Sequence, residues 1–316
     1  MLGNLEMLKN YSLIIKATSS FLLFTIIIQI LLGAWVRLTG SGMSCPDWPL
    51  CYGFFFPSYE KINALGITEY TYFQIFLEWI HRANAAFIIG PITIILFLYL
   101  IFNAKVEKKI KKYSYYLIIL LGIQGLLGGL TVIKSNIPWS VAIHLASAFL
   151  LFYIVLNIFL LTFDDSKHKI IVTKFLKNLC YITLCLALIT ACAGAFTSKY
   201  GASLSCSSWP SCNEKFFPNI SDQFEIIHFT HRVLAFCLVT LILYVLFRLK
   251  NSFKHLPYRS KVAYILIPVI IFLQIIIGAS LIVFEIPIWM GIFHQFMGLL
   301  LFASITIMLS NLKEKS

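Results

Sequence analysis

The chain has 316 residues, of which 59% are hydrophobic and only 12% are charged, and its mean hydropathy is +0.87. Soluble globular domains contain roughly 45–50% apolar and about 25% charged residues, so this composition excludes an ordinary soluble protein. The formal net charge of +12 does not indicate nucleic-acid binding, because the basic residues form short blocks between apolar runs, as membrane topology requires.

Apolar runs of about 20 residues, each long enough to cross a hydrocarbon core of about 30 Å, recur along the whole sequence. The first run is too long for the apolar core of a cleavable signal and lacks a small-residue cleavage site, so we interpret it as a span. The predicted fold class is an all-α polytopic membrane protein with eight transmembrane helices. The expected spans are 16–38, 74–102, 113–134, 138–162, 173–197, 224–249, 260–284 and 287–311.

The connections between these spans alternate in charge. Both ends of the chain and three loops (103–112, 163–177 and 248–261) hold 18 of the 25 basic residues. The positive-inside rule therefore predicts that both termini are cytoplasmic and that the long loops 39–73 and 198–223 face outward.

The two halves of the sequence resemble each other. Polar and aromatic positions in corresponding spans recur at an offset of 150 residues. The matched pairs are His81-Arg82 with His231-Arg232, Gln124 with Gln274, Gly128 with Gly278, Trp139 with Trp289 and His144 with His294. The Cys-x5-Cys segments 45–51 and 206–212 match at an offset of 161, so the first outer loop contains an insertion of 11 residues. Because each copy has four spans, we expect a parallel repeat of two four-helix bundles, residues 1–165 and 166–316.

Four histidines lie inside expected spans, each about two turns, or roughly 10 Å, from the outer end. They are His81, His144, His231 and His294. Ionisable residues inside a membrane are costly and point to function. One such histidine would be explained equally well by a hydrogen bond to a neighbouring helix. Two pairs at one depth favour haem, because neutral imidazoles from facing helices are axial ligands of haem iron.

Residues beside these histidines suit a porphyrin. Gly128, Gly129 and Gly278 would leave room for a flat macrocycle, and Arg82 and Arg232 suit pairing with haem propionates. Zinc or copper is disfavoured, because the sequence offers no third or fourth protein ligand at the same depth.

The repeat breaks at Glu78, which precedes His81 by three residues and shares its helix face. The position 150 residues later is His228, not an acid. A carboxylate beside one site predicts that the N-terminal half does chemistry while the other half holds a structural or electron-transfer haem. The alternative is that Glu78 caps a helix start or pairs with Arg82.

The second half contains Glu225-x-x-His228, which is a competing register for the ligand. His231 is preferred, because it carries the His-Arg dipeptide and keeps the spacing of 63 residues to the next histidine in both halves.

Two cysteine pairs, Cys45/Cys51 and Cys206/Cys212, fall in loops expected on the outer, oxidising side. Disulfides are expected there on grounds of compartment. A structural staple is the favoured interpretation of the second pair, whereas a strained or exposed first pair would be redox-active.

Over nearly its whole length the chain resembles the haem A synthase family. The resemblance rests on Arg37-Leu-Thr-Gly-Ser-Gly42, Cys45-Pro-Asp-Trp-Pro-Leu-Cys51, Glu78-Trp-Ile-His81-Arg82, Gln124 with Gly128-Gly-Leu-Thr131, His144, and their second-half partners. It implies an enzyme of the bacterial inner membrane that oxidises a methyl group of haem O to the formyl group of haem A by successive hydroxylations. The product would support the assembly of haem–copper oxidases.

The resemblance also implies roles for particular residues. His231 and His294 would ligate a permanent haem b, while His81 and His144 would face the substrate haem near the outer side of the membrane. Glu78 corresponds to the family's important outer-loop acid. The family's loop disulfides correspond to Cys45–Cys51 and Cys206–Cys212.

Haem O is the expected substrate, with haem O synthase and an external electron donor as partners, because the chain has no nicotinamide or flavin fingerprint. The sequence leaves open whether the chain forms a homo-oligomer. Two alternatives are a non-enzymatic di-haem b-type cytochrome and a haem carrier. The cytochrome predicts two symmetric sites, and the carrier predicts broken helices near mid-membrane.

Overall fold

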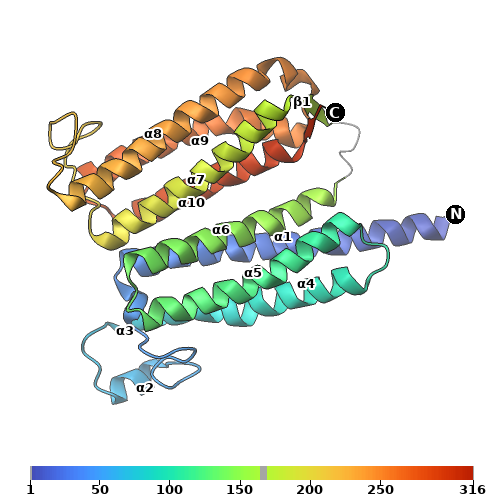
Figure 1. Cartoon of the computed structure of the whole chain (residues 1–316). Helices are drawn as coiled ribbons and strands as arrows, with labels where there is room; N and C mark the ends of the chain where they lie inside the picture. The colour runs from blue at the N-terminus through green and yellow to red at the C-terminus, as the bar shows by residue number, and fades with distance from the viewer. Residues whose placement is uncertain (1, 164–168, 316) are drawn as a thin grey trace. The chain divides into compact units, whose positions relative to one another are not determined.

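The computed structural model describes residues 2–163 and 169–315, and most of these residues are helical (Figure 1). Eight of the helical segments described are long and apolar enough to cross a membrane, which confirms the predicted fold class. These segments are Ser12–Leu38, Tyr72–Phe102, Lys108–Ile133, Pro138–Leu161, Lys174–Tyr200, Gln223–His255, Tyr258–Val283 and Ile288–Ser310. Each of them overlaps one expected span.

The chain divides into two compact units, Met1–Thr162 and Phe163–Ser316. The boundary expected after residue 165 falls within 164–168, outside the described residues. The first unit contains α1 (Leu2–Leu38), α3 (Tyr72–Ala83), α4 (Gly90–Phe102), α5 (Lys108–Ile133) and α6 (Pro138–Leu161). The second contains α7 (Lys174–Tyr200), α8 (Gln223–Leu249), η4 (Lys250–His255), α9 (Tyr258–Val283) and α10 (Ile288–Ser310).

Within each unit the spans pack in a closed ring. In the first unit α1 contacts α3, α4 contacts α5, α5 contacts α6, and α6 returns to α1. In the second unit α7 contacts α8, α8 contacts α9, α9 contacts α10, and α10 returns to α7. The second and fourth spans of each unit therefore lie diagonally opposite each other, and so do the first and third.

The fourth span of each unit contributes most to its interior. In an apolar 18-residue stretch of each span, 56% of the residues of α6 and 50% of those of α10 are buried, against 17–33% in the other spans. Phe149 of α6 and Phe302 of α10 are among the largest fully buried side chains. The exposed side chains of the remaining spans are largely apolar, as expected for a surface in contact with lipid.

The second span of the first unit is not a continuous α-helix. A π-helical turn, η2 (Asn84–Ile89), separates α3 from α4, and Pro91 follows directly in the first turn of α4. Proline lacks an N–H group and its ring clashes with the carbonyl four residues earlier, so the helix must widen there. The corresponding position in the second unit is Leu241, and α8 runs through without interruption.

The outer loops differ in size. The first contains η1 (Ser41–Met43) and α2 (Tyr59–Ala64), which packs on a small core of Cys45, Cys51, Ile62 and Ile75. This helix belongs to the predicted insertion. In Figure 1 the loop lies at the end of its unit away from the N-terminus.

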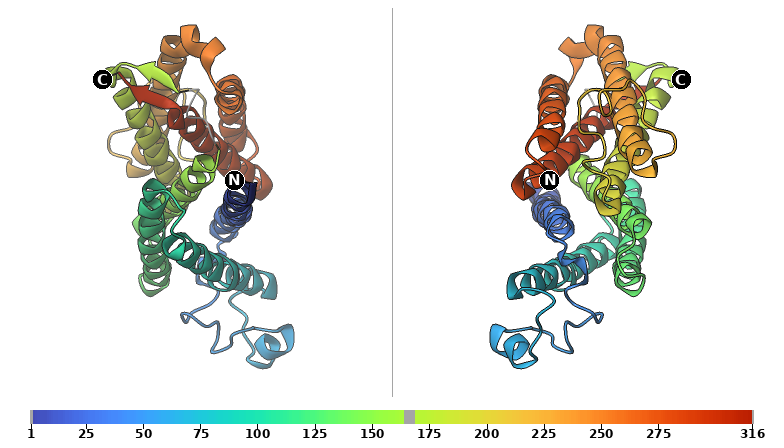
Figure 2. Two further views of the ribbon diagram at one scale, coloured as in Figure 1. Left: turned by 90° about the vertical axis from the view of Figure 1, so that its right-hand side faces the viewer. Right: turned by 90° about the vertical axis from the view of Figure 1, so that its left-hand side faces the viewer.

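The all-α prediction omits one small feature of the second unit. Two short strands, β1 (Ile170–Val172) and β2 (Leu312–Glu314), pair in parallel, with Ile170 opposite Leu312. Figure 2 shows this pair beside the C-terminus.

Candidate functional site

Each of the four intramembrane histidines packs its ring against a glycine of a neighbouring helix. A Cβ atom at the glycine would lie 3.1 Å from His81 Cε1 at Gly33, 3.4 Å from His144 Cε1 at Gly128, 2.9 Å from His231 Cε1 at Gly194, and 3.2 Å from His294 Cε1 at Gly278. The contact at Gly194 leaves no space for a Cβ atom unless the imidazole moves, those at Gly33 and Gly278 are tight, and that at Gly128 is an ordinary van der Waals contact. Glycine at these positions therefore lets the rings lie close to helix backbone.

The two histidines of each unit come from diagonally opposite spans. In the first unit His81 lies on α3 and His144 on α6. The glycines that support them lie on α1 and α5, the other diagonal. The second unit repeats this plan, with the histidines on α8 and α10 and the glycines on α7 and α9.

The helices that carry the first histidine of each pair begin at well-formed caps. Thr71 and Gln74 form a reciprocal capping box at the start of α3. The Asp222 side chain accepts hydrogen bonds from the N–H groups of Phe224 and Glu225 at the start of α8. Such caps satisfy backbone donors that have no partner within the helix, so they fix where each helix starts and which face its histidine occupies.

The residues present fit a haem. Nδ1 of His144 and Nδ1 of His231 are buried and have no hydrogen-bond partner among the described residues. A buried polar atom without a partner costs free energy, and such atoms mark sites of ligands or ions. Residues 2–163 and 169–315 contain no cluster of three or more His, Cys, Asp or Glu side chains that could hold a metal ion by itself. A pair of imidazoles on diagonally opposite helices would suit an iron whose other ligands belong to a macrocycle.

Glutamine side chains approach three of the four rings. Gln124 Nε2 lies 3.4 Å from His144 Nε2, and Gln274 Nε2 lies 3.4 Å from His294 Nε2, so this contact is repeated. Gln124 and Gln274 are repeat positions in the sequence, whereas Gln29 was not predicted. Its Nε2 lies 3.2 Å and 3.3 Å from the two ring nitrogens of His81. Gln29 was missed because the position 161 residues later is a threonine, so no repeat marks it.

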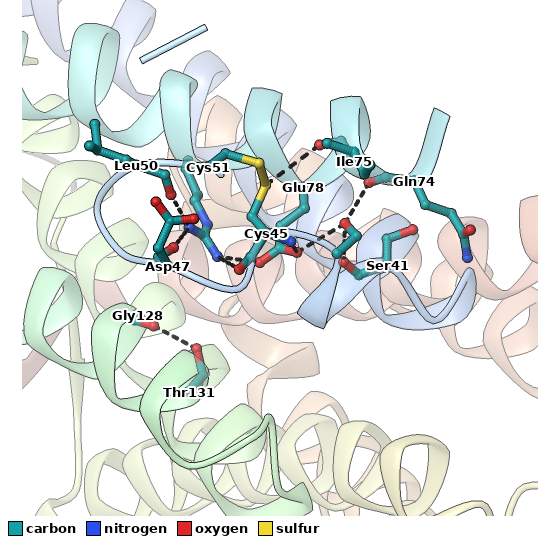
Figure 3. Close-up of polar contacts among 12 residues, drawn as sticks. Ser41, Cys45, Asp47, Leu50, Cys51, Gln74, Ile75, Glu78, Gly128 and Thr131 are labelled. Atoms are coloured by element: carbon teal, nitrogen blue, oxygen red, sulfur yellow. Dashed lines mark hydrogen bonds and ion pairs between the residues drawn. A yellow bond between two sulfur atoms is a disulfide. The ribbon is translucent and has the colours of Figure 1, made fainter. Parts of the chain in front are cut away.

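Glu78 is buried, at 4% exposure, and is held by the outer loop (Figure 3). Its Oε2 accepts hydrogen bonds from the Cys45 N–H group at 2.8 Å and from the Ser44 hydroxyl at 3.0 Å. Its Oε1 forms an ion pair with Arg82 at 2.5 Å. The pairing with Arg82 that the sequence left as an alternative is therefore present, and it fixes the carboxylate one turn from His81.

The two arginines bind the outer loops. Arg82 donates from Nη1 to the carbonyl groups of Asp47 and Leu50, and from Nη2 to that of Cys45 and to Glu78. Arg232 donates in the same way to the carbonyl groups of Cys206, Ser208, Pro210 and Ser211. These bonds engage both terminal nitrogens of each guanidinium group. The pairing with haem propionates expected for Arg82 and Arg232 stays a prediction, and the loop carbonyl groups are the partners that the structure shows.

His228 occupies the place of Glu78 in the second unit. Its Nδ1 accepts a hydrogen bond from the Cys206 N–H group at 3.3 Å, just as Glu78 accepts one from Cys45. Glu225 instead binds loop groups, among them the Asn213 amide. The competing register, with His228 as the ligand, is disfavoured because the glycine on α7 supports His231.

Both predicted disulfides are present. Cys45–Cys51 has an S–S distance of 2.00 Å and Cys206–Cys212 one of 2.01 Å, and all four residues are buried. The Trp-Pro bond inside each loop is cis.

Gly129 lies against the first loop. A Cβ atom there would lie 3.4 Å from the indole of Trp48, in ordinary van der Waals contact, so the room for a macrocycle expected at Gly129 stays a prediction. The first loop thereby covers α5 next to Gly128.

The first outer loop also concentrates acidic groups near two tyrosines. Burial raises the pKa of Tyr52, and the nearby carboxylate of Glu69 raises it further. Burial and Glu69 raise the pKa of Tyr70 as well. Both phenols therefore stay neutral and keep their O–H donors throughout the physiological pH range.

The chain is similar in sequence to known proteins over most of its length. The family model COX15-CtaA, described as cytochrome oxidase assembly protein, matches residues 17–306. The chain is 27% identical to a haem A synthase of Flavobacterium psychrophilum, with 90% of this chain and 93% of the relative covered. It is 26% identical to a haem A synthase of Alkalihalophilus pseudofirmus, with 90% and 92% covered, and 27% identical to one of Shewanella oneidensis, with 87% and 89% covered.

Proposed function

Because the chain belongs to the COX15-CtaA family of cytochrome oxidase assembly proteins, we propose that it oxidises haem O in its N-terminal unit and keeps a haem b in its C-terminal unit. Its activity is that of haem A synthase, an oxidoreductase that converts haem O to haem A.

One observation carries the proposal. A diagonal pair of histidines, each seated on a helix glycine, occurs once in each unit, so the chain has two sites of the same kind. Among the described residues, only the first site has a carboxylate, that of Glu78, within one turn of its glycine-seated histidine and buried beneath an outer loop. Two similar sites with one acid fit one resident cofactor and one substrate better than they fit two electron-transfer haems.

The chain's own residues have separate tasks in this proposal. His81 and His144 bind and orient the substrate, while His231 and His294 hold the haem b. A bound haem supplies a redox-active iron. Glu78, fixed by Arg82 and the Cys45 N–H group, is positioned to hold or release a proton at its carboxylate. The disulfide loop places Trp48 against Gly129 of α5, beside Gly128.

Orientation and partners follow from charge and chemistry. The basic loops support cytoplasmic termini, which would bring both histidine pairs toward the outer face. Haem O is very apolar, so it would arrive from the membrane or directly from haem O synthase. The electrons would come from an external donor. The proposal is independent of whether the chain forms a homo-oligomer.

The test is to co-express the full chain with a haem O producer and to separate the extracted haems by chromatography. Purified protein should contain haem b together with haem O or haem A, and the cells should accumulate haem A. His231→Ala and His294→Ala should each remove the haem b. A colourless protein would contradict the proposal, and haem b alone without haem A would favour the di-haem cytochrome.

A further inference from the structure

We propose that both disulfide loops dip into the bilayer, where the phenylalanine pairs Phe55-Phe56 and Phe216-Phe217 contact lipid at the boundary between acyl chains and headgroups. This interaction surface occurs in both units and does not depend on the haem chemistry proposed above. Its occupant is the lipid of the leaflet at the end of the spans where both disulfides lie.

Each pair of phenylalanines follows a tight turn that begins at the second cysteine of the disulfide. The N–H and carbonyl groups of Cys51 pair with those of Phe54 at 3.1 and 3.0 Å. Cys212 pairs with Lys215 in the same way, at 3.0 Å in both directions. The two residues inside each turn have positive φ angles, and side-chain oxygens of the loops accept hydrogen bonds from N–H groups there. The two turns therefore share one backbone shape and fix the residues that follow them.

The phenylalanines belong to the repeat of the two halves. The segments Phe55-Phe56-Pro57 and Phe216-Phe217-Pro218 match at the same offset of 161 residues as the cysteines. The first phenylalanine of each pair is the more exposed, at 76% for Phe55 and 82% for Phe216, while Phe56 is 48% and Phe217 68% exposed. Adjacent large apolar side chains that are exposed in both copies of a loop indicate an interaction surface.

The second phenylalanine of each pair packs on the side of a span. The ring centroid of Phe56 lies 4.9 Å from that of Trp79 in α3. The ring centroid of Phe217 lies 6.4 Å from that of Phe229 in α8, which is the residue equivalent to Trp79 at the offset of 150. In the first unit the Trp79 indole N–H also donates to the Phe55 carbonyl oxygen at 2.6 Å, which binds the loop to the helix.

These contacts lie well inside the ends of the spans. Trp79 is the eighth residue of α3 and Phe229 the seventh of α8, so each contact is roughly 10 Å from the start of its helix. The segments Tyr72–Phe102 and Gln223–His255 have 31 and 33 residues, which makes them about 46–50 Å long. Because a hydrocarbon core measures roughly 30 Å, an excess shared by both ends puts its boundary about 8–10 Å from each end. The phenylalanines therefore lie at the depth where aromatic side chains are enriched in membrane proteins.

Lipid is the occupant that fits the surroundings of these contacts. Large apolar side chains next to them on the same spans are exposed, among them Phe73 and Phe76 of α3 and Ile226 and Val233 of α8. Figures 1 and 2 show the first loop, with α2, displaced to one side of the helices of its unit. A loop that lies against the exposed flank of a span meets the same lipid as the span itself.

A basic side chain accompanies each pair. In the first loop Lys61 Nζ lies 4.8 Å from the ring centroid of Phe54. In the second loop Lys215 takes the place of Phe54 and directly precedes Phe216. Lysine beside apolar rings suits the headgroup level, because its stem packs on apolar groups while its ammonium group meets lipid phosphates.

The experiment photocross-links the full-length protein in vesicles of phosphatidylcholine and phosphatidylglycerol. Phe55→p-benzoylphenylalanine and Phe216→p-benzoylphenylalanine keep an aromatic ring and react with nearby C–H bonds under ultraviolet light. Mass spectrometry should find loop peptides that carry the mass of a phospholipid. The matched controls place the same probe at Glu60 and Glu214, which are exposed in the same loops. We expect about tenfold more lipid adduct at the phenylalanine positions, because burial of a phenyl ring in lipid favours the immersed loop by at least that factor.

Two results would overturn the inference. One is an equal yield of lipid adducts at Phe216 and Glu214 and at Phe55 and Glu60. The other is a cross-linked dimer of the chain, or a conjugate with another protein after irradiation of native membranes, in place of lipid adducts, since a protein surface would then cover the phenylalanines. The two loops are tested separately, so a variant that fails to accumulate leaves the other loop to decide.

Discussion

Glu78 binds the disulfide loop and is also the proposed acid–base group of the N-terminal unit. Its carboxylate joins the disulfide loop to α3 through Cys45 and Arg82, so replacing it affects charge and loop together. Glutamine has nearly the same shape and can still accept from the Cys45 N–H group. Glu78→Gln therefore removes the charge and the proton-holding capacity while leaving the loop contact in place.

We expect Glu78→Gln to retain haem b and to lower haem A formation by roughly 100-fold, the usual contribution of a general acid or base. Haem chromatography of membranes from co-expressing cells measures both quantities. His228→Gln is the matched control, because His228 makes the equivalent loop contact in the other unit and should leave haem A formation high. Undiminished haem A in the Glu78→Gln strain would show that the Glu78 carboxylate takes no part in the reaction.

The glycine contacts give a second prediction at this scale. Gly194→Ala places a methyl group 2.9 Å from His231 Cε1, which forces the ring to move and should remove most of the haem b. Gly122→Ala is the control, since nothing lies within 4 Å of a Cβ atom there. Absorbance of haem b per purified protein separates the two variants. Full haem b occupancy in Gly194→Ala would show that His231 does not need a glycine beside its ring.

The sequence alone predicted the four histidines as site residues but not all of their neighbours. The four rings were predictable because a repeat duplicates them at one depth in an apolar chain. The carbonyl partners of Arg82 and Arg232 were not, because the path of the outer loop decides which oxygen atoms a long side chain reaches. Gln29 escaped notice because the feature that distinguishes it is the lack of a counterpart.

At the scale of elements, the spans followed from hydrophobic length, since any helix that crosses lipid must stay apolar for about 20 residues. The π-helical turn did not follow. Pro91 is visible in the sequence, but Pro268 is as well, and α9 continues through it without a separate segment. The response of a helix to proline depends on whether neighbours re-satisfy its freed carbonyl groups.

The two disulfide loops are bound to the helices that carry His81 and His231. Arg232 is adjacent to His231 and holds four carbonyl oxygens of the second loop. We expect Arg232→Gln to release this loop and to raise its cleavage rate by added protease roughly tenfold, because several charge-assisted bonds are lost. Limited proteolysis of vesicles measures the rate. Arg248→Gln should cleave like wild type, because Arg248 contacts the exposed Tyr244; equal rates for both variants would argue against the tie.

At the scale of the whole molecule, a sequence repeat whose two copies have diverged would allow one chain to have two sites of different behaviour, as proposed. The shared part is backbone geometry: diagonal histidines, glycine seats and an arginine that holds a disulfide loop. The divergent part is polar. Glu78, Gln29, Asn84 and Ser147 in the first unit correspond to His228, Thr190, Leu234 and Met297 in the second. Because both units pack their helices in the same ring, these few side chains can differ without disturbing either bundle.

Membrane orientation is a prediction about the entire chain. The basic blocks place residues 103–112 and 248–261, together with both termini, on the cytoplasmic side. Each disulfide would then lie on the oxidising side, which its chemistry requires. Alkaline phosphatase fused after residue 68 or 221 should be active, whereas fusion at the C-terminus should be inactive. A fluorescent reporter at the C-terminus should show the reverse pattern. Active phosphatase at the C-terminus would show that the chain has the opposite orientation. Both disulfide loops would then lie in a reducing compartment, where these cross-links do not persist.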